Sequence, residues 1–476
     1  MKNKNNLFFN IFFLLIVVPI MLLSVYNYSG TKIIYLLYSL SAIFFFIYLT
    51  NSKSLFFENF LALYFFLGYW VSFFIKISFF NSDFENYSDG FGDFDFSKHS
   101  YDNVLSVCML SFVSLIIGSF IRRKVISYQI VNLSLFKHEK KEKLFLNDKS
   151  LSFSFIIGIL FLSFLNYYFI FFQKGTVTNP DVHILIVNFS KWFFTMAYIS
   201  LFAFFITYLL RKKNNFPLYL AITYLITELV VSISILSRGS IFNGTSILWG
   251  IKKFMPLKHI KKLLFLFSFL GILFIINIII VKELRTNQAM KGNDRFTTNP
   301  IDGTTDDKLY PNYEKNYDLN IISKINRILV SRLHGFEAIM AVEGHQYKGF
   351  DFFYRALKIK NSTDELSFFD TMKNDPRQTD FSNVSITIPG MIAFLYYSNS
   401  YILIFFSLIF ILILICLIEK LIFHYTSGNL IFLSFIGHSF AYRLWHFGHN
   451  PSNTHMFLLS IFLSCLLIIF LNRIFK

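Results

Sequence analysis

The feature that most constrains this chain is a series of apolar runs that recurs from its first residues to its last. Several of them reach the roughly 20 residues that a helix needs to cross about 30 Å of hydrocarbon, where the backbone must satisfy its own hydrogen bonds. Hydrophobic residues make up 55% of the chain, and their runs are too long for a soluble core, so the sequence predicts an all-α polytopic membrane protein. A cleaved signal peptide before a secreted domain is not expected, since the first run lacks a small-residue cleavage site.

The apolar runs predict about twelve transmembrane helices. Short cytoplasmic loops carry an excess of Lys and Arg, so the basic tracts set the orientation. Basic residues precede the first run and follow the fourth, sixth, eighth and twelfth, which predicts that both termini are cytoplasmic in a bacterial inner membrane. The expected spans are 7–26, 33–50, 56–79, 104–121, 151–172, 192–210, 217–236, a short eighth span ending at 250, 263–281, 401–418, 430–447 and 456–472.

One long polar stretch, residues 282–385, interrupts this pattern. It divides the chain into nine spans (1–281), a large extracytoplasmic loop (282–398) and three further spans (399–476). The stretch has fifteen basic and fifteen acidic residues, and this balance argues against a nucleic-acid-binding arm and a disordered acidic tail. We therefore expect a folded, partly helical cap. Apolar spacing predicts a helix over 318–344, and the short apolar segment 386–397 predicts a re-entrant or surface-lying helix.

Arginine is concentrated on the predicted outer side of the membrane. Four of the twelve arginines fall in predicted cytoplasmic segments, and the other eight lie at or beyond the outer face, at positions 238, 285, 295, 327, 332, 355, 377 and 443. A guanidinium group presents a rigid, permanently charged fork that matches two phosphate oxygens. The distribution therefore predicts an anionic ligand such as a lipid pyrophosphate. The alternative is that the loop arginines pair with the carboxylates of their own loop.

Two of these arginines adjoin apolar runs. Arg238 stands in the turn Ser237-Arg238-Gly239-Ser240 between two such runs, and Arg443 is about a turn from the outer end of the eleventh span. A charge in apolar surroundings needs a partner, which favours a bound ligand. The alternative is that both side chains snorkel to the lipid headgroups.

The predicted helix 318–344 carries the other candidates. At about 100° per residue, Arg332 falls in the middle of its apolar stripe, where the side chain points into the protein or at a buried anion. Arg327 and His334 share another face, and His334 is either a base or an ordinary exposed histidine. Glu337 and the nearby His345 are further acid–base candidates.

The order of these features resembles that of the Wzy-type oligosaccharide repeat unit (O-antigen) polymerases. The resemblance is carried by the number of spans, the turn at Arg238 and Gly239, the late outer loop with a helix bearing Arg332 and Glu337, and the segment 385–391, SITIPGM. It covers most of the chain as an architecture and rests on short motifs. The related O-antigen ligases share the layout.

The resemblance implies glycan transfer at the outer face of the membrane, from undecaprenyl pyrophosphate to a sugar hydroxyl of another lipid-linked repeat unit. Inversion at the anomeric carbon, no cofactor and no metal are implied. The implied partners are the lipid-linked oligosaccharide and the bilayer, with a chain-length regulator protein as a further candidate and no nucleic acid. The implied pyrophosphate-binding residues are Arg238, Arg327, Arg332 and Arg443, and the candidate bases are Glu337, His334 and His446.

Several alternatives compete with this interpretation. Asp93 and Asp95 form a DxD motif that could bind a divalent ion with a sugar phosphate, which would reduce the role of the arginines. A flippase or small-anion exporter would need ionisable groups along its path, and the sequence predicts few, mainly Glu228, His438 and Arg443. An O-antigen ligase, or a non-catalytic partner in envelope synthesis, fits the same layout.

Overall fold

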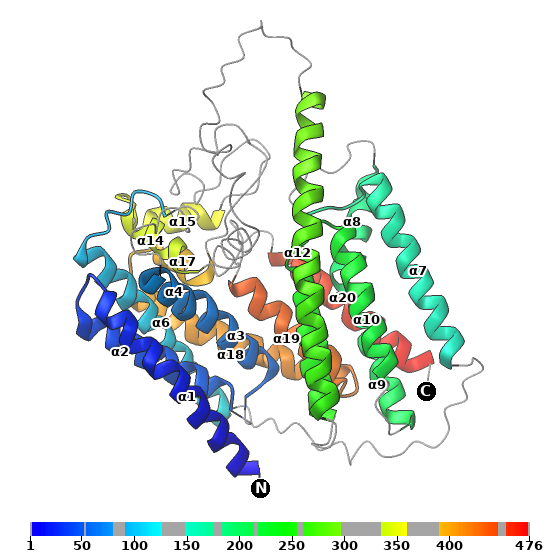
Figure 1. Ribbon diagram of the computed structural model, residues 1–476, viewed down its shortest axis with the longest axis horizontal. Helices are drawn as coiled ribbons and strands as arrows, with labels where there is room; N and C mark the ends of the chain where they lie inside the picture. The colour runs from blue at the N-terminus through cyan, green and yellow to red at the C-terminus, as the bar shows by residue number, and fades with distance from the viewer. Residues whose placement is uncertain are drawn as a thin grey trace, which may run out of the picture.

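The computed structural model describes residues 2–51, 54–79, 91–125, 148–174, 182–213, 218–254, 260–296, 335–358, 390–445 and 454–474 (Figure 1). Every regular element in these ranges is a helix, which confirms the all-α prediction for this part of the chain. The candidate residues Arg327, Arg332, His334 and His446 lie outside the described residues, as does the first part of the predicted helix 318–344.

Most helices begin and end within a few residues of the predicted spans. In chain order they are α1 (Lys2–Asn27), α2 (Lys32–Leu49), α3 (Phe56–Phe65), η1 (Phe66–Val71), α4 (Ser72–Phe79), α6 (Lys98–Val125), α7 (Asp148–Phe169), α8 (Ile184–Trp192), η4 (Phe193–Ala197), α9 (Tyr198–Lys213), α10 (Leu218–Ser234), η5 (Ser240–Phe242), α11 (Asn243–Phe254), α12 (Ile260–Phe296), α14 (Phe336–Gly344), α15 (Phe350–Lys358), α17 (Gly390–Tyr396), α18 (Tyr401–Tyr425), α19 (Leu430–Trp445) and α20 (Thr454–Ile474). The elements η1 and η4 are π-helical turns inside longer helices.

Seven helices within the described ranges are long and apolar enough to cross a membrane. They are Lys32–Leu49, Phe56–Phe79, Lys98–Val125, Ile184–Leu210, Lys261–Arg285, Tyr401–Tyr425 and Thr454–Ile474. Leu14–Asn27, Phe153–Phe169 and Leu218–Ser234 are shorter apolar helices. The chain is thus a helical protein suited to a lipid bilayer, and the count of twelve crossings stays a prediction.

Helix α12 runs past the predicted boundary at residue 281. It continues to Phe296, because the apolar run is followed by Lys282, Glu283, Leu284 and Arg285, which favour a helix, and not by a glycine or proline. The prediction followed hydrophobicity alone, which marks where a helix leaves lipid and not where it ends.

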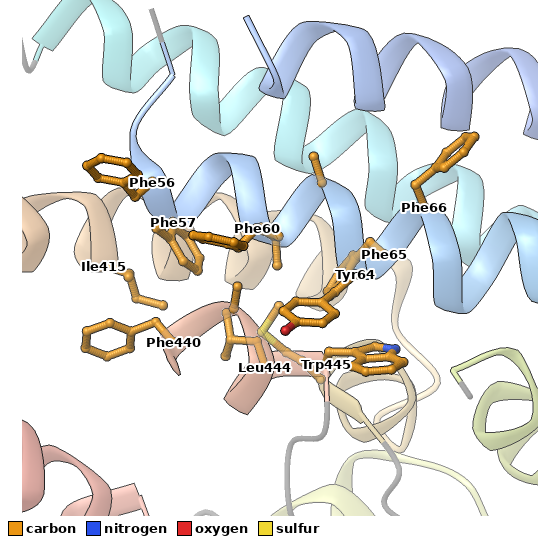
Figure 2. Packing of buried hydrophobic residues seen from close by; sticks show 14 of the residues in the cluster. Phe56, Phe57, Phe60, Tyr64, Phe65, Phe66, Ile415, Phe440, Leu444 and Trp445 are labelled. Carbon is orange, nitrogen blue, oxygen red and sulfur yellow. The ribbon is translucent and has the colours of Figure 1, made fainter. Parts of the chain in front are cut away.

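Helix α19 is the central element of the bundle. In Figure 1 it lies between one group of helices that includes α2, α3, α6 and α18 and a second group that includes α7, α9, α10 and α12. It packs chiefly against α3 on one side and α11 on the other, and nearly all of its side chains are buried. Aromatic residues fill the contact with α3, where Phe60 and Tyr64 face Phe440, Leu444 and Trp445 (Figure 2).

The three short helices that the structure describes in the predicted loop, α14, α15 and α17, lie together at one end of the bundle, here called the loop end (Figure 1). Helix α14 begins only at Phe336, because Gly335 before it has a φ of 149°, so the prediction of one continuous helix over 318–344 is wrong at this point. Helix α14 ends at Gly344, as predicted, and a Cβ there would lie 2.6 Å from the backbone of Asp93 and Phe94, so only glycine fits. Helix α17 is too short to cross a membrane and all of its side chains are buried, in keeping with a re-entrant helix. The start of α1 and the end of α20 lie on the opposite side of the bundle (Figure 1).

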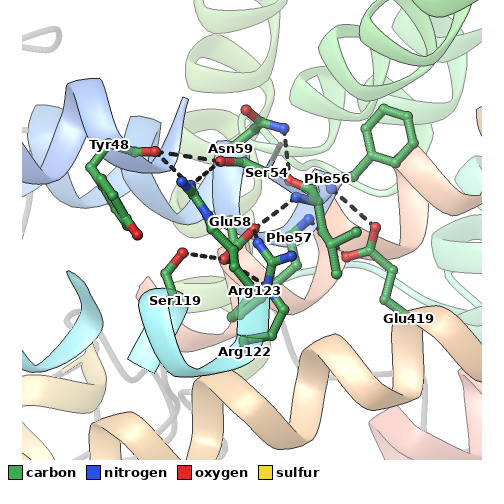
Figure 3. A network of polar contacts seen from close by, with 11 residues as sticks. Tyr48, Ser54, Phe56, Phe57, Glu58, Asn59, Ser119, Arg122, Arg123 and Glu419 are labelled. Atoms are coloured by element: carbon green, nitrogen blue, oxygen red, sulfur yellow. Dashed lines mark hydrogen bonds and ion pairs between the residues drawn. The ribbon is translucent and has the colours of Figure 1, made fainter. Parts of the chain in front are cut away.

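The opposite end of the bundle is held by a buried polar network (Figure 3). Glu58 forms an ion pair with Arg122 of α6 and accepts a hydrogen bond of 2.5 Å from the Ser119 hydroxyl. Glu419 of α18 accepts hydrogen bonds from the backbone N–H groups of Phe56 and Phe57, both 3.0 Å long. Glu58 also accepts a hydrogen bond of 2.7 Å from the backbone N–H of Leu55. The two carboxylates therefore satisfy free amides at the start of α3 and tie it to α6 and α18.

The sequence-based list of buried ionisable groups was too short. Glu58, Lys76, Arg122, Glu337 and Glu419 are also buried, at about the same depth of burial as Glu228 and His438. Arg122 is one of the basic residues after the fourth apolar run, which in the sequence serve only to indicate the cytoplasmic side. Sequence patterns miss such groups because their partners lie on distant segments of the chain.

Candidate functional site

The loop end of α19 meets the turn that carries Arg238. A Cβ on Gly239 would lie 2.8 Å from the hydroxyl oxygen of Tyr442, so the turn is pressed directly against α19. Arg238 precedes Gly239, and Arg443 follows Tyr442. The two arginines that the sequence singled out therefore adjoin one contact between two distant segments. We call this region, with the end of α19, the α19 site.

The turn at residues 236–239, here called the Arg238 turn, is held by groups from α12. The side chain of Asn277 donates hydrogen bonds to the carbonyls of Ser237 (3.2 Å) and Arg238 (3.4 Å). Leu236 has a φ of 49°, which is uncommon for a residue with a branched side chain. Such strained backbone persists where the surroundings fix it, as they do here.

Two further cationic residues adjoin the Arg238 turn. In the sequence, Arg285 counts among the outer arginines without being singled out, and Lys174 has no expected role. The guanidinium group of Arg285 donates hydrogen bonds to the carbonyls of Leu236 (2.6 Å) and Lys174 (2.6 Å). Burial lowers the pKa of Lys174 to about 8, against the opposing effect of the nearby Glu228 carboxylate. Arg285 therefore supports the turn through its hydrogen bonds to backbone carbonyls.

Arg443 is partly exposed, but its Nε atom is buried. Within the described ranges this Nε makes no hydrogen bond. A buried donor without an acceptor is unfavourable by about 1–3 kcal/mol in protein mutational data. An anionic ligand at the end of α19 would supply the missing acceptor.

An aromatic cluster lies beside Arg443 on α19. The Tyr64 hydroxyl and His438 Nε2 are 2.5 Å apart, and the Tyr442 ring stacks on the imidazole with centroids 6.1 Å apart. Tyr64 also stacks on Trp445 at 5.0 Å, as Figure 2 shows. His438 is therefore packed by aromatic rings, which fixes the last turns of α19 and so the position of Arg443.

Glu337 has a partner that the sequence did not reveal. Its carboxylate forms an ion pair with the ammonium group of Lys76 on α4, and each side chain is at most 2% exposed. The ring of Phe336 stacks on Phe73 of α4 with centroids 3.8 Å apart. Both contacts dock α14 on the membrane-length helix Phe56–Phe79, and the carboxylate already faces a cation. Glu337 is thus better suited to docking than to accepting a proton.

Glu343 joins three helices at the loop end. Its carboxylate accepts a hydrogen bond of 2.9 Å from Asn103 of α6, pairs with Lys348, and accepts a hydrogen bond from the hydroxyl of Tyr396 on α17. Burial lowers the pKa of the adjacent His345, and the nearby Asp93 opposes this effect. These contacts of Glu343 tie α14 to α6 and α17.

The DxD motif has a structural use. The carboxylate of Asp95 accepts a hydrogen bond of 2.9 Å from the backbone N–H of Ser97, just before α6, and this bond holds the pKa of Asp95 below its usual value. Among the residues that the structure describes, no group of three or more His, Cys, Asp and Glu side chains could hold a metal ion.

The contact at the Arg238 turn can be tested by adding one methyl group. In Gly239→Ala the new Cβ would lie 2.8 Å from the Tyr442 hydroxyl oxygen but 3.8 Å from Cζ of the same ring. We expect Gly239→Ala to lower the unfolding temperature in detergent, as overpacking by about 1–3 kcal/mol does, and Tyr442→Phe in the same chain to relieve it. Gly271→Ala is the control, because nothing lies within 4 Å of its Cβ. Equal unfolding temperatures for Gly239→Ala and the wild type would exclude the contact.

Comparison with models of known protein families, with curated proteins and with solved structures gave no match. In the residues that the structure describes, the chain is helical with membrane-length helices, and the Arg238 turn contacts the end of α19.

Proposed function

We propose that the protein is an integral-membrane glycosyltransferase that polymerises lipid-linked oligosaccharide repeat units. In this proposal the chain crosses the bacterial inner membrane about twelve times with both termini in the cytoplasm, and the loop end faces outward. The substrate is an oligosaccharide on undecaprenyl pyrophosphate, and the product is an O-antigen or capsule type of glycan.

The observation that carries the proposal is the contact between Gly239 and Tyr442. It puts Arg238 and Arg443 on facing elements at the loop end, beside an apolar helix bundle that suits a polyprenyl chain. Guanidinium groups at the border of a bilayer match the head group of a lipid diphosphate, whose tail stays in the hydrocarbon.

In the proposed reaction, the hydroxyl oxygen of the acceptor sugar attacks the anomeric carbon of the donor glycan. A new glycosidic C–O bond forms as the bond between the anomeric carbon and the phosphate oxygen breaks. Undecaprenyl pyrophosphate leaves with the bonding electron pair, and Arg238 and Arg443 stabilise the charge that develops on it. The hydroxyl proton passes to a base, for which His334 and His446 remain the candidates once Glu337 is paired with Lys76.

The proposal is tested by deleting the gene from its host and analysing the surface glycan. A polymerase defect is expected to leave glycans of one repeat unit at the cell surface, because export and attachment still proceed. The wild-type gene on a plasmid, as the control, should restore long chains. A surface without any repeat unit would instead indicate a ligase or a flippase, and unchanged long chains would exclude all three functions.

A further inference from the structure

Tyr69 lies at an irregular point of the membrane-length helix Phe56–Phe79. It belongs to the π-helical turn η1, and such turns occur frequently at functional sites. Its side chain is completely buried, and its backbone carbonyl accepts a hydrogen bond of 2.9 Å from the hydroxyl of Tyr38. The position of the Tyr69 ring is therefore fixed by the surrounding helices.

The phenol end of Tyr69 lies between two glycines that are far apart in sequence. A Cβ on Gly335 would lie 3.2 Å from Cζ of Tyr69, and a Cβ on Gly390 would lie 3.1 Å from its hydroxyl oxygen. Both glycines have a positive φ, 149° and 70°, which other residues rarely adopt. The starts of α14 and α17 thus come close to the hydroxyl without placing a side chain on it.

The hydroxyl of Tyr69 has no hydrogen-bond partner among the described residues. Folded proteins leave few buried polar groups in this state, and each one calls for an explanation. Replacement by phenylalanine would remove the unpaired group without opening a cavity, so stability alone does not account for a tyrosine here.

A row of direct contacts connects this hydroxyl with the α19 site. A Cβ placed on Gly390 would lie 3.1 Å from the Tyr69 hydroxyl oxygen and 2.9 Å from the carbonyl oxygen of Trp445, so Gly390 lies between these two groups. Trp445 is two residues beyond Arg443 on α19, and Tyr442 on the same helix touches Gly239 of the Arg238 turn. The unpaired hydroxyl therefore borders the same end of α19 as both arginines.

We propose that the Tyr69 hydroxyl donates a hydrogen bond to an oxygen of the diphosphate head group of the substrate. The inference rests on the proposed function and deepens it by adding an uncharged donor to the two arginines. Phosphate oxygens accept several hydrogen bonds at once, and a bond to a charged acceptor is stronger than a neutral one. The bound head group satisfies the hydroxyl that the free protein leaves unpaired.

The test compares Tyr69→Phe with Tyr35→Phe, a matched change at another completely buried tyrosine whose hydroxyl also has no hydrogen-bond partner among the described residues. Each protein is purified in nanodiscs, and the binding of sugar-free undecaprenyl pyrophosphate and the unfolding temperature are measured. We expect Tyr69→Phe to unfold at the wild-type temperature or above and to bind the lipid about tenfold to a hundredfold more weakly. Tyr35→Phe should bind it as the wild type does.

Wild-type binding by Tyr69→Phe would overturn the inference. So would a lowered unfolding temperature in this variant, because the hydroxyl would then have a structural role, or a failure of the wild type to bind the lipid. If the lipid binds in a Tyr69-dependent way but the protein extends no glycan, the inference stands and the polymerase proposal fails.

Discussion

Replacing Arg443 by alanine is expected to lower the rate of glycan transfer by about a hundredfold to a thousandfold. Removing one donor that stabilises charge in a transition state has an effect of this size in other enzymes. Arg443 suits this role because its buried Nε lacks an acceptor among the described residues. Arg238→Ala should have an effect of the same order, since the Arg238 turn faces the same end of α19. The rate is measured with purified protein in proteoliposomes, as undecaprenyl pyrophosphate released.

The matched control is Arg355→Ala. Arg355 is an exposed arginine on α15 at the same end of the bundle, so its loss removes a charge without touching the α19 site. Arg443→Lys keeps the charge but loses the two-pronged donor, and an intermediate rate is expected. Equal rates for Arg443→Ala and Arg355→Ala would mean that the charge at position 443 has no special role.

Breaking the ion pair between Lys76 and Glu337 is expected to have the largest effect on stability. Either Lys76→Met or Glu337→Met leaves one charge buried between α4 and α14, which destabilises by about 3–5 kcal/mol in comparable buried pairs. The free energy of unfolding is measured by denaturant titration in detergent. Lys348→Met is the control, because Lys348 and Glu343 form a pair that is closer to solvent and should matter less.

The double variant Lys76→Met/Glu337→Met tests whether Glu337 only holds α14 against α4 or also takes part in the reaction. Two apolar side chains of similar size can replace a buried pair with little loss, so the free energy of unfolding should return close to the wild-type value. Because the structure favours docking, we expect this variant to transfer glycan within about tenfold of the wild-type rate, less than the loss of a general base would cost. A double variant that is stable but inactive would instead make Glu337 a participant in the reaction.

The helices could be predicted from the sequence because lipid imposes a simple rule on length and hydrophobicity. The expected run 56–79 corresponds to one continuous helix, and the end of α14 at Gly344 was also foreseen. The η1 turn inside 56–79 was not foreseen, because a π-helical turn is a shift of hydrogen-bond register that no residue pattern marks.

The site could be predicted only in part. Arg238 and Arg443 were recognised as charges beside apolar runs, and the structure puts their elements in contact through Gly239 and Tyr442. The partner of Glu337 was missed because Lys76 looks like an isolated charge near the end of a span. Long-range pairs of this kind leave no trace in spacing or periodicity.

The central claim is that Arg238 and Arg443 act on one diphosphate group. Its most direct test is the transfer rate in proteoliposomes of four proteins, the wild type, Arg238→Ala, Arg443→Ala and the double variant. Residues that act on one group have effects that do not simply multiply, so the double variant should be much less impaired than the product of the two single effects. Effects that multiply fully, or single variants as fast as the wild type, would contradict a shared site.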